Sequence, residues 1–297
     1  MHRPSTVELM LVTTVVLWAL NVTVSRYLLT EGFQPLAYST LRYGAAALIF
    51  VALTLALERG VFVARGDLRR AGVATALLFL NQLGFVYALD RTTASTVALI
   101  LGATPVFAAL LGAALGIERV TTRIWGAVAV SFAGVALVAL GSGRELSGDM
   151  VGNLFAVATA ATWAAYSIAV TPLMARYTAY RVSALVLVAT AAALGVAGAT
   201  QTAGQELDLG WERWALFTFA VLGPLVVTNV LWYRSLYRIG AARATLAANL
   251  HPFVAVVFAV VLLAETMTLV QVAGGGLVAA GIALARRRAP VSAPRPG

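Results

Sequence analysis

The chain has 297 residues, of which 61% are hydrophobic and 11% charged, and its mean hydropathy is +0.88. Soluble domains are roughly half apolar, so this composition excludes a soluble globular protein and predicts a membrane protein. All 21 basic residues are arginines in short segments between apolar stretches, which is typical of a topology signal. A nucleic-acid interface would gather them in one folded domain, so nucleic acid is not an expected partner. The absence of cysteine excludes disulfides and cysteine metal sites.

Ten apolar stretches are long enough to cross a bilayer, which takes about 20 residues. In chain order the predicted spans are 7–29, 36–57, 68–89, 94–115, 122–141, 151–172, 180–200, 211–235, 241–263 and 268–286. The first stretch has no small-residue cleavage site after a short apolar core, so we expect it to stay in the protein as a span. The sequence therefore predicts an all-α membrane protein with ten transmembrane helices in a bacterial inner (plasma) membrane.

The arginines are distributed unevenly among the segments that connect these spans. With the amino terminus inside, sixteen lie on the cytoplasmic side and only Arg91, Arg144 and Arg213 on the opposite side, while Arg26 and Arg42 fall inside helices. Cytoplasmic loops carry the excess of basic residues in membrane proteins. Because the number of spans is even, both termini are predicted to be cytoplasmic.

The two halves of the chain resemble each other when the second is shifted by 147 residues. Pro105 then lies opposite Pro252, and each proline is thirteen residues ahead of a glutamate. Since five spans is an odd number, the second half must run in the opposite direction across the membrane. We expect two inverted five-helix repeats, residues 1–145 and residues 146–297, the second ending in a basic tail. Such repeats are typical of secondary transporters, with the substrate site between them near the midplane.

Several of these features occur together in one known group of transporters. They are a tryptophan on the first helix of each half (Trp18 and Trp163), Arg42 on the second helix, the Ala-Leu-x-x-Thr-x-Ala run over 88–94, and the proline-to-glutamate segment that ends each fourth helix. On these residues the chain resembles the ten-helix EamA-type exporters of the drug/metabolite transporter (DMT) superfamily over nearly its whole length. Within that group it is most similar to the YddG-type aromatic amino acid exporters. It departs from the pattern in that the second half has no counterpart of Arg42.

Four helices that are related in pairs by the repeat carry an amide or a hydroxyl beside an aromatic residue. The candidate cavity residues on them are Trp18, Asn21, Gln82, Phe85, Trp163, Tyr166, Asn229, Trp232 and Tyr233. Apolar walls with a few placed polar groups suit an amphipathic solute. The alternative is that these polar groups only bond helices together, for about 1 kcal/mol or less each. Their repetition in both halves favours a cavity.

Two prolines and a histidine add to this expected site. Pro105 and Pro252 cannot donate to the carbonyls of Leu101 and Ala248, which predicts helix kinks and two carbonyls free to contact a substrate. The alternative is a static kink that only shapes packing. His251 is the titratable side chain expected at membrane depth in the second half, and it is a candidate contact for a proton or a substrate. Otherwise the midplane region is expected to offer almost no fixed charge.

Small residues and two glutamates have simpler interpretations. Glycines crowd spans five and ten, for example at Gly134 and Gly274, and small residues let helix backbones approach closely. This pair of spans is predicted to be a scaffold away from the substrate. Glu118 and Glu265 stand at the ends of spans, where a solvated or capping role is expected.

No phosphate-binding glycine loop, HExxH pair or nucleophile elbow occurs in the sequence, so an ATP-driven pump, a membrane hydrolase and a cofactor enzyme have no support. The sequence predicts an exporter of amino acids, aromatic or large apolar ones, that works by alternating access without ATP. Its expected partners are these small molecules and the lipid bilayer. A multidrug or other metabolite exporter is the alternative within transport, and a membrane-embedded enzyme or assembly subunit the alternative outside it. The oligomeric state stays open, with a monomer as one option.

Overall fold

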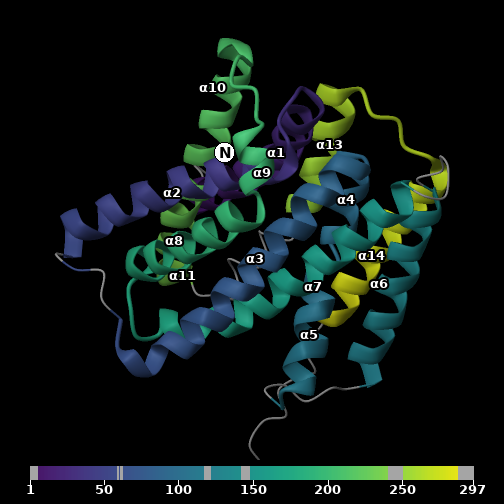
Figure 1. The fold of residues 1–297 in the computed structure, drawn as a ribbon. Helices are drawn as coiled ribbons and strands as arrows, with labels where there is room; N and C mark the ends of the chain where they lie inside the picture. Colours follow the sequence, from purple (N-terminus) through teal and green to yellow (C-terminus); the bar gives the residue numbers. More distant parts are fainter. Residues whose placement is uncertain are drawn as a thin grey trace, which may run out of the picture.

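A computed structural model describes residues 6–58, 60, 63–116, 122–141, 148–239 and 250–286, and every regular element within these ranges is a helix (Figure 1). In chain order the elements are α1 (Thr6–Thr30), α2 (Pro35–Glu58), the 3-10 turn η1 (Arg65–Asp67), α3 (Leu68–Arg91), α4 (Ala94–Leu101), α5 (Thr104–Ala114), α6 (Thr122–Gly141), α7 (Gly148–Met174), α8 (Ala179–Ala197), α9 (Ala199–Ala203), α10 (Gly210–Val221), the π-helix η2 (Leu222–Val227), α11 (Thr228–Ile239), α13 (His251–Leu263) and α14 (Leu269–Arg286).

Seven helices among the described residues are long and apolar enough to cross a membrane. They correspond to predicted spans one to four and six to eight. Shorter apolar helices, Trp125–Gly141, His251–Leu263 and Leu269–Leu284, occupy the positions of spans five, nine and ten. The start of the ninth span and both chain ends lie outside the described residues. The all-helical membrane fold is therefore shown, whereas the count of ten spans and the side of the termini stay predictions.

The fourth span is divided where Pro105 is expected to break it. α4 ends at Leu101, α5 begins at Thr104, and Pro105 is the second residue of the new helix. The hydroxyl of Thr104 donates to the carbonyl of Leu101 at 2.7 Å. The carbonyl expected to be free for a substrate thus already accepts an internal hydrogen bond.

The eighth span is interrupted as well, at a position the sequence analysis did not single out. Pro224 lies in the π-helix η2, which separates α10 from α11. Proline has no N–H and cannot continue the α-helical hydrogen bonds, and π-bulges are a frequent result of such local disruption. The break leaves the carbonyl of Ala220 without its usual donor, because that donor would be residue 224.

Spans five and ten pack closely as predicted, and α6 and α14 run side by side in Figure 1. A Cβ atom added at Gly134 would lie 2.7 Å from the carbonyl oxygen of Gly274, and one added at Gly274 would lie 2.7 Å from that of Gly134. At the end of the pair, the Thr268 hydroxyl donates to the Gly141 carbonyl at 2.9 Å. Only glycine allows this approach of the two backbones, so the close packing predicted from the small residues is confirmed.

Glu265 joins the segment after α13 to the beginning of α4. One carboxylate oxygen accepts the Ala94 N–H at 2.8 Å, and the other accepts the Ser95 N–H at 2.8 Å and the Ser95 hydroxyl at 2.6 Å. A carboxylate at a helix N-terminus satisfies unpaired N–H groups and meets the positive end of the helix dipole. Of the two roles expected for Glu265, solvated or capping, the structure shows capping, while Glu118 lies outside the described residues.

Candidate functional site

Trp18 and two other predicted site residues lie close together, each on a different helix. The ring of Trp18 on α1 lies 5.3 Å from that of Trp232 on α11 and 6.5 Å from that of His251 at the start of α13, the latter edge-on at 90°. The Trp18 indole N–H donates to the hydroxyl of Thr228 at 2.9 Å. We call Trp18, Thr228, Trp232 and His251 the aromatic cluster.

The aromatic cluster combines a fixed core with accessible rings. Thr228 is fully buried, and its hydroxyl also donates to the Pro224 carbonyl at 2.6 Å. Because this hydroxyl accepts one hydrogen bond from Trp18 and donates another to Pro224, its position is fixed. Trp18, Trp232 and His251 are half-buried. A partly exposed aromatic surface with an imidazole beside it offers apolar contact area and a polar edge, which is the chemistry an amphipathic ligand requires.

A second aromatic group lies on α7. Trp163 and Tyr166 have ring centroids 5.5 Å apart at an interplanar angle of 39°, and Trp163 is 41% exposed. Trp18 and Trp163 are the tryptophans on the first helix of each half. Each has a neighbouring ring, which for Trp18 comes from α11 and for Trp163 from α7 itself.

The two candidates on α3 are more deeply placed. Phe85 is buried in the hydrophobic core. Gln82 is 6% exposed, and its amide N–H donates to the Asn81 side-chain oxygen at 3.0 Å, whereas its own oxygen has no hydrogen-bond partner among the described residues. An unpaired buried carbonyl costs roughly 1–3 kcal/mol. Gln82 is therefore the candidate whose geometry most calls for a bond from a ligand or a water molecule.

Asn21 is part of a buried network that the sequence analysis did not anticipate. The guanidinium of Arg42 on α2, which is only 3% exposed, donates through NH2 to the Asn21 oxygen at 2.9 Å and through Nε to the Ala220 carbonyl at 3.0 Å. It also lies 5.6 Å from the centroid of the Tyr38 ring, a cation–π distance. The hydroxyls of Ser25 and Tyr38 share a hydrogen bond of 2.8 Å within the same network.

Arg42 supplies the donor that Pro224 lacks. The Ala220 carbonyl would accept from the N–H of residue 224 in a regular helix, and Arg42 donates to it in place of that group. At the 147-residue shift, Leu77 on the unbroken helix α3 stands opposite Pro224. The first half has no proline break there, which explains why the second half has no counterpart of Arg42. The sequence shows Arg42 in one span and Pro224 in another, but nothing in the sequence indicates that the two are close in the fold.

Arg42 thus places a basic side chain in the buried interior, and the expectation that the midplane region offers almost no fixed charge stays a prediction. No carboxylate pairs with Arg42 in the described part of the chain. Charged groups inside a membrane protein commonly mark functional positions.

The remaining predicted residues are not brought into the aromatic cluster. The side-chain amide of Asn229 donates to the carbonyl of Leu225, four residues earlier in η2. Pro252 follows His251 as the second residue of α13. The side chain of Tyr233 and the carbonyl of Ala248 lie outside the described residues.

Comparison with known proteins identifies relatives over nearly the whole chain. The EamA-like transporter family matches twice, over residues 5–140 and 150–287. A probable terminal-alkyne amino-acid exporter of Streptantibioticus cattleyicolor is 31% identical over an alignment that covers 91% of this chain and 93% of the relative. An uncharacterized transporter of Archaeoglobus fulgidus is 25% identical over an alignment that covers 94% of this chain and 98% of the relative. One crystal structure aligns with a TM-score of 0.62 at 20% identity, over 96% of this chain and 97% of that one, which concerns the fold alone.

Proposed function

Because this chain belongs to the EamA-like transporter family of the DMT superfamily, we propose that it exports amino acids, with aromatic or large apolar ones preferred, by alternating access through a central cavity without ATP. The observation that carries this proposal is the convergence of Trp18, Trp232 and His251 from three helices. The relative from Streptantibioticus cattleyicolor, an amino-acid exporter by name, supports the substrate class.

The aromatic rings suit the side chain of such an amino acid, and Arg42 suits its carboxylate. Rings that pack against an aromatic side chain add about 0.5–1.5 kcal/mol beyond the burial of apolar area. Arg42 provides positive charge near the cluster, since its partner Asn21 is one helical turn from Trp18 on α1. A carboxylate attracted by Arg42 and a side chain resting on the aromatic rings would orient the solute.

The proposed membrane arrangement is ten spans in two inverted repeats, with both termini in the cytoplasm of a bacterial inner membrane. The arginine distribution and the seven long and three shorter apolar helices support it. Reporter fusions at each terminus test it: an alkaline phosphatase, active only outside the cytoplasm, should be inactive at both ends. Activity at either end would contradict the arrangement.

A transport assay tests the substrate. Purified protein in liposomes would be loaded with one unlabelled amino acid and assayed for exchange with labelled phenylalanine, tryptophan, alanine and threonine. Propargylglycine, a terminal-alkyne amino acid, belongs in the same panel because of the relative's name. We expect exchange to be fastest for phenylalanine and tryptophan. Exchange of none of these solutes would refute amino-acid export, and inhibition by cationic dyes alone would favour a multidrug exporter.

Tryptophan variants test which residues give the preference for aromatic amino acids. Trp232→Ala and Trp163→Ala should lower phenylalanine exchange relative to alanine exchange by about two- to tenfold, which corresponds to the loss of one aromatic contact. Trp125→Ala is the matched control, because Trp125 on α6 is exposed and lies outside both aromatic groups. Equal losses for every solute would mean that Trp232 and Trp163 support the fold and do not contact the substrate.

A further inference from the structure

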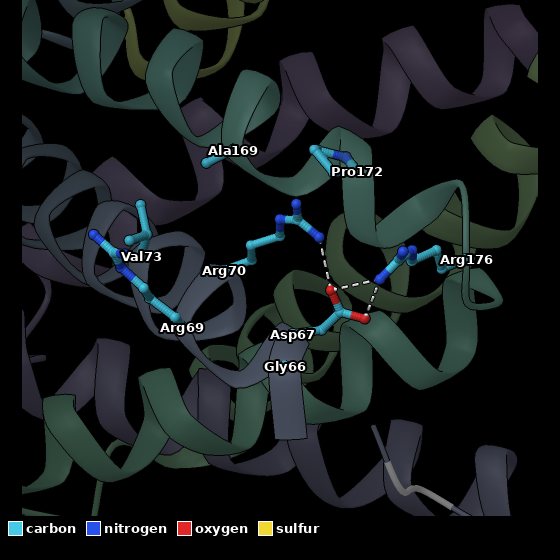
Figure 2. A pocket seen from close by; sticks show the side chains of 8 residues that line it. All are labelled: Gly66, Asp67, Arg69, Arg70, Val73, Ala169, Pro172 and Arg176. Carbon is cyan, nitrogen blue, oxygen red and sulfur yellow. Dashed lines mark hydrogen bonds and ion pairs between the residues drawn. The ribbon is translucent and has the colours of Figure 1, made fainter. Parts of the chain in front are cut away.

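A cavity of about 570 Å³ opens between the start of α3 and the end of α7, and no residue of the aromatic cluster lines it (Figure 2). Arg69 and Arg70 at the beginning of α3 and Arg176 after α7 line its polar part. Val73 and Pro172 line its apolar part. We call this cavity the arginine groove.

The arginine groove carries an excess of positive charge. Asp67 is buried and binds Arg70 at 2.8 Å, Arg176 at 2.9 Å and the Tyr177 hydroxyl at 2.9 Å. The side chains of Arg70 and Arg176 nevertheless stay 52% and 60% exposed. Arg69 is exposed and has no partner among the described residues. With three arginines and one carboxylate, the groove keeps two positive charges, and Asp67 holds two of the guanidinium groups in place (Figure 2).

Helix geometry places the groove on the outer side of α7. Pro172 follows Leu154 by eighteen residues, which is five turns, so both point in one direction, and Leu154 is 62% exposed. Trp163 is nine residues from each, or two and a half turns, and therefore points in the opposite direction. The groove and the candidate substrate residue Trp163 thus lie on opposite faces of α7.

The neighbouring face of α3 continues this apolar surface. Arg69, Val73 and Leu80 follow one another at four and seven residues, which places them on one side of the helix. Val73 and Leu80 are large exposed hydrophobic side chains. In a membrane protein an exposed apolar strip of this kind faces lipid, so the arginine groove stands at the end of a lipid-facing strip formed by α3 and α7, which pack side by side.

We propose that the arginine groove binds the phosphate headgroup of an anionic phospholipid, with the acyl chains lying along Val73 and Leu80 of α3. Guanidinium groups bind phosphate oxygens through two parallel N–H bonds. Basic pockets between membrane helices are suited to anionic headgroups, and the cytoplasmic leaflet, where the arginine distribution puts this end of the molecule, carries such lipids. A bound lipid would reinforce the connection between α3 and α7 that Asp67 already makes.

A stability titration tests this proposal. Purified full-length protein in a neutral detergent would be titrated with dioctanoyl phosphatidylglycerol, dioctanoyl phosphatidylcholine and glycerol 3-phosphate while the Tm is followed. We expect phosphatidylglycerol to raise the Tm and the other two to leave it nearly unchanged. An equal effect of phosphatidylcholine would overturn the headgroup assignment. A full effect of glycerol 3-phosphate would assign the groove to a soluble phosphate ester and overturn the lipid.

A pair of variants places the effect in the groove. Arg69→Gln should require about fivefold more phosphatidylglycerol for the same Tm shift, as expected for one arginine near a charged headgroup. It leaves the bonds of Asp67 intact, so the Tm without lipid should not change. Arg65→Gln is the matched control, because Arg65 is exposed, lies four residues earlier and does not line the groove.

Native mass spectrometry of the same samples provides a second measurement. The wild-type protein and Arg65→Gln should retain phosphatidylglycerol, and Arg69→Gln should retain markedly less. Identical titrations and identical lipid retention in Arg69→Gln and Arg65→Gln would overturn the proposal, as would a wild-type protein that shows neither a Tm shift nor retained lipid.

Discussion

Arg42 and Pro224 should be coupled in stability, because the arginine donates to the carbonyl that the proline leaves without a helical donor. Arg42→Met removes that bond and the bond to Asn21. Hydrogen bonds made by charged groups contribute about 1.5–3 kcal/mol each, but burying the charge costs several kcal/mol. The stability of Arg42→Met alone therefore does not show whether Arg42 and Pro224 are coupled. The difference between the cost of Arg42→Met in the wild-type protein and its cost in Pro224→Ala does show it, because the cost of burying the charge is the same in both.

In the Pro224→Ala background, residue 224 regains an N–H that can return to the Ala220 carbonyl. Arg42→Met should then be less damaging than it is in the wild-type background by about 1 kcal/mol, in the range measured for polar contacts between membrane helices. The free energy of unfolding of the four proteins, measured by reversible unfolding with sodium dodecyl sulfate in mixed micelles, gives this difference directly.

The control uses the other helix-interior proline, Pro172 in α7, which has no contact with Arg42. Arg42→Met and Pro172→Ala should have additive effects. Costs of Arg42→Met that agree within about 0.5 kcal/mol in the wild-type and Pro224→Ala backgrounds would refute the reasoning. Arg42 would then act through Asn21 alone.

Three further predictions follow from contacts elsewhere in the molecule. Trp18→Phe keeps the ring but loses the N–H bond to Thr228, so it should lower the unfolding free energy by about 1 kcal/mol. Thr228→Val also loses the bond to the Pro224 carbonyl, and it should cost less in the Trp18→Phe background than in the wild-type protein because the indole bond is already absent. Gly274→Ala puts a Cβ 2.7 Å from the Gly134 carbonyl oxygen and should destabilise the α6–α14 pair by about 1–3 kcal/mol. Glu265→Gln weakens the cap of α4 and should lower stability by about 1 kcal/mol, measured by thermal unfolding.

Each of these has a control within the chain. Full additivity of the Trp18 and Thr228 variants would mean that the indole bond does not link them. Gly276→Ala should be neutral, since no atom lies within 4 Å of its added Cβ, and equal effects at positions 274 and 276 would contradict the packing argument. Glu206→Gln changes an exposed glutamate, and a loss of stability as large as that of Glu265→Gln would mean that charge alone, and not the cap, matters.

The sequence by itself determined the kind of protein and most of the helices. Membrane helices depend on local runs of apolar residues, so the seven long helices could be recognised without tertiary information. The packing of Gly134 against Gly274 and the cap formed by Glu265 were also predictable, because small residues and a helix-end carboxylate each have few roles. Trp18, Trp232 and His251 were each predicted to line a cavity. The structure places the rings of Trp232 and His251 within 6.5 Å of that of Trp18, and the cavity itself stays a prediction.

Only the tertiary structure decided which polar groups bond to one another. Arg42 and Ala220 are 178 residues apart, and no local pattern indicates that an arginine on α2 replaces the N–H missing at Pro224. Apolar burial is nonspecific and can be predicted from composition, whereas a hydrogen bond needs two groups within about 3 Å in the right direction, which only the folded chain fixes.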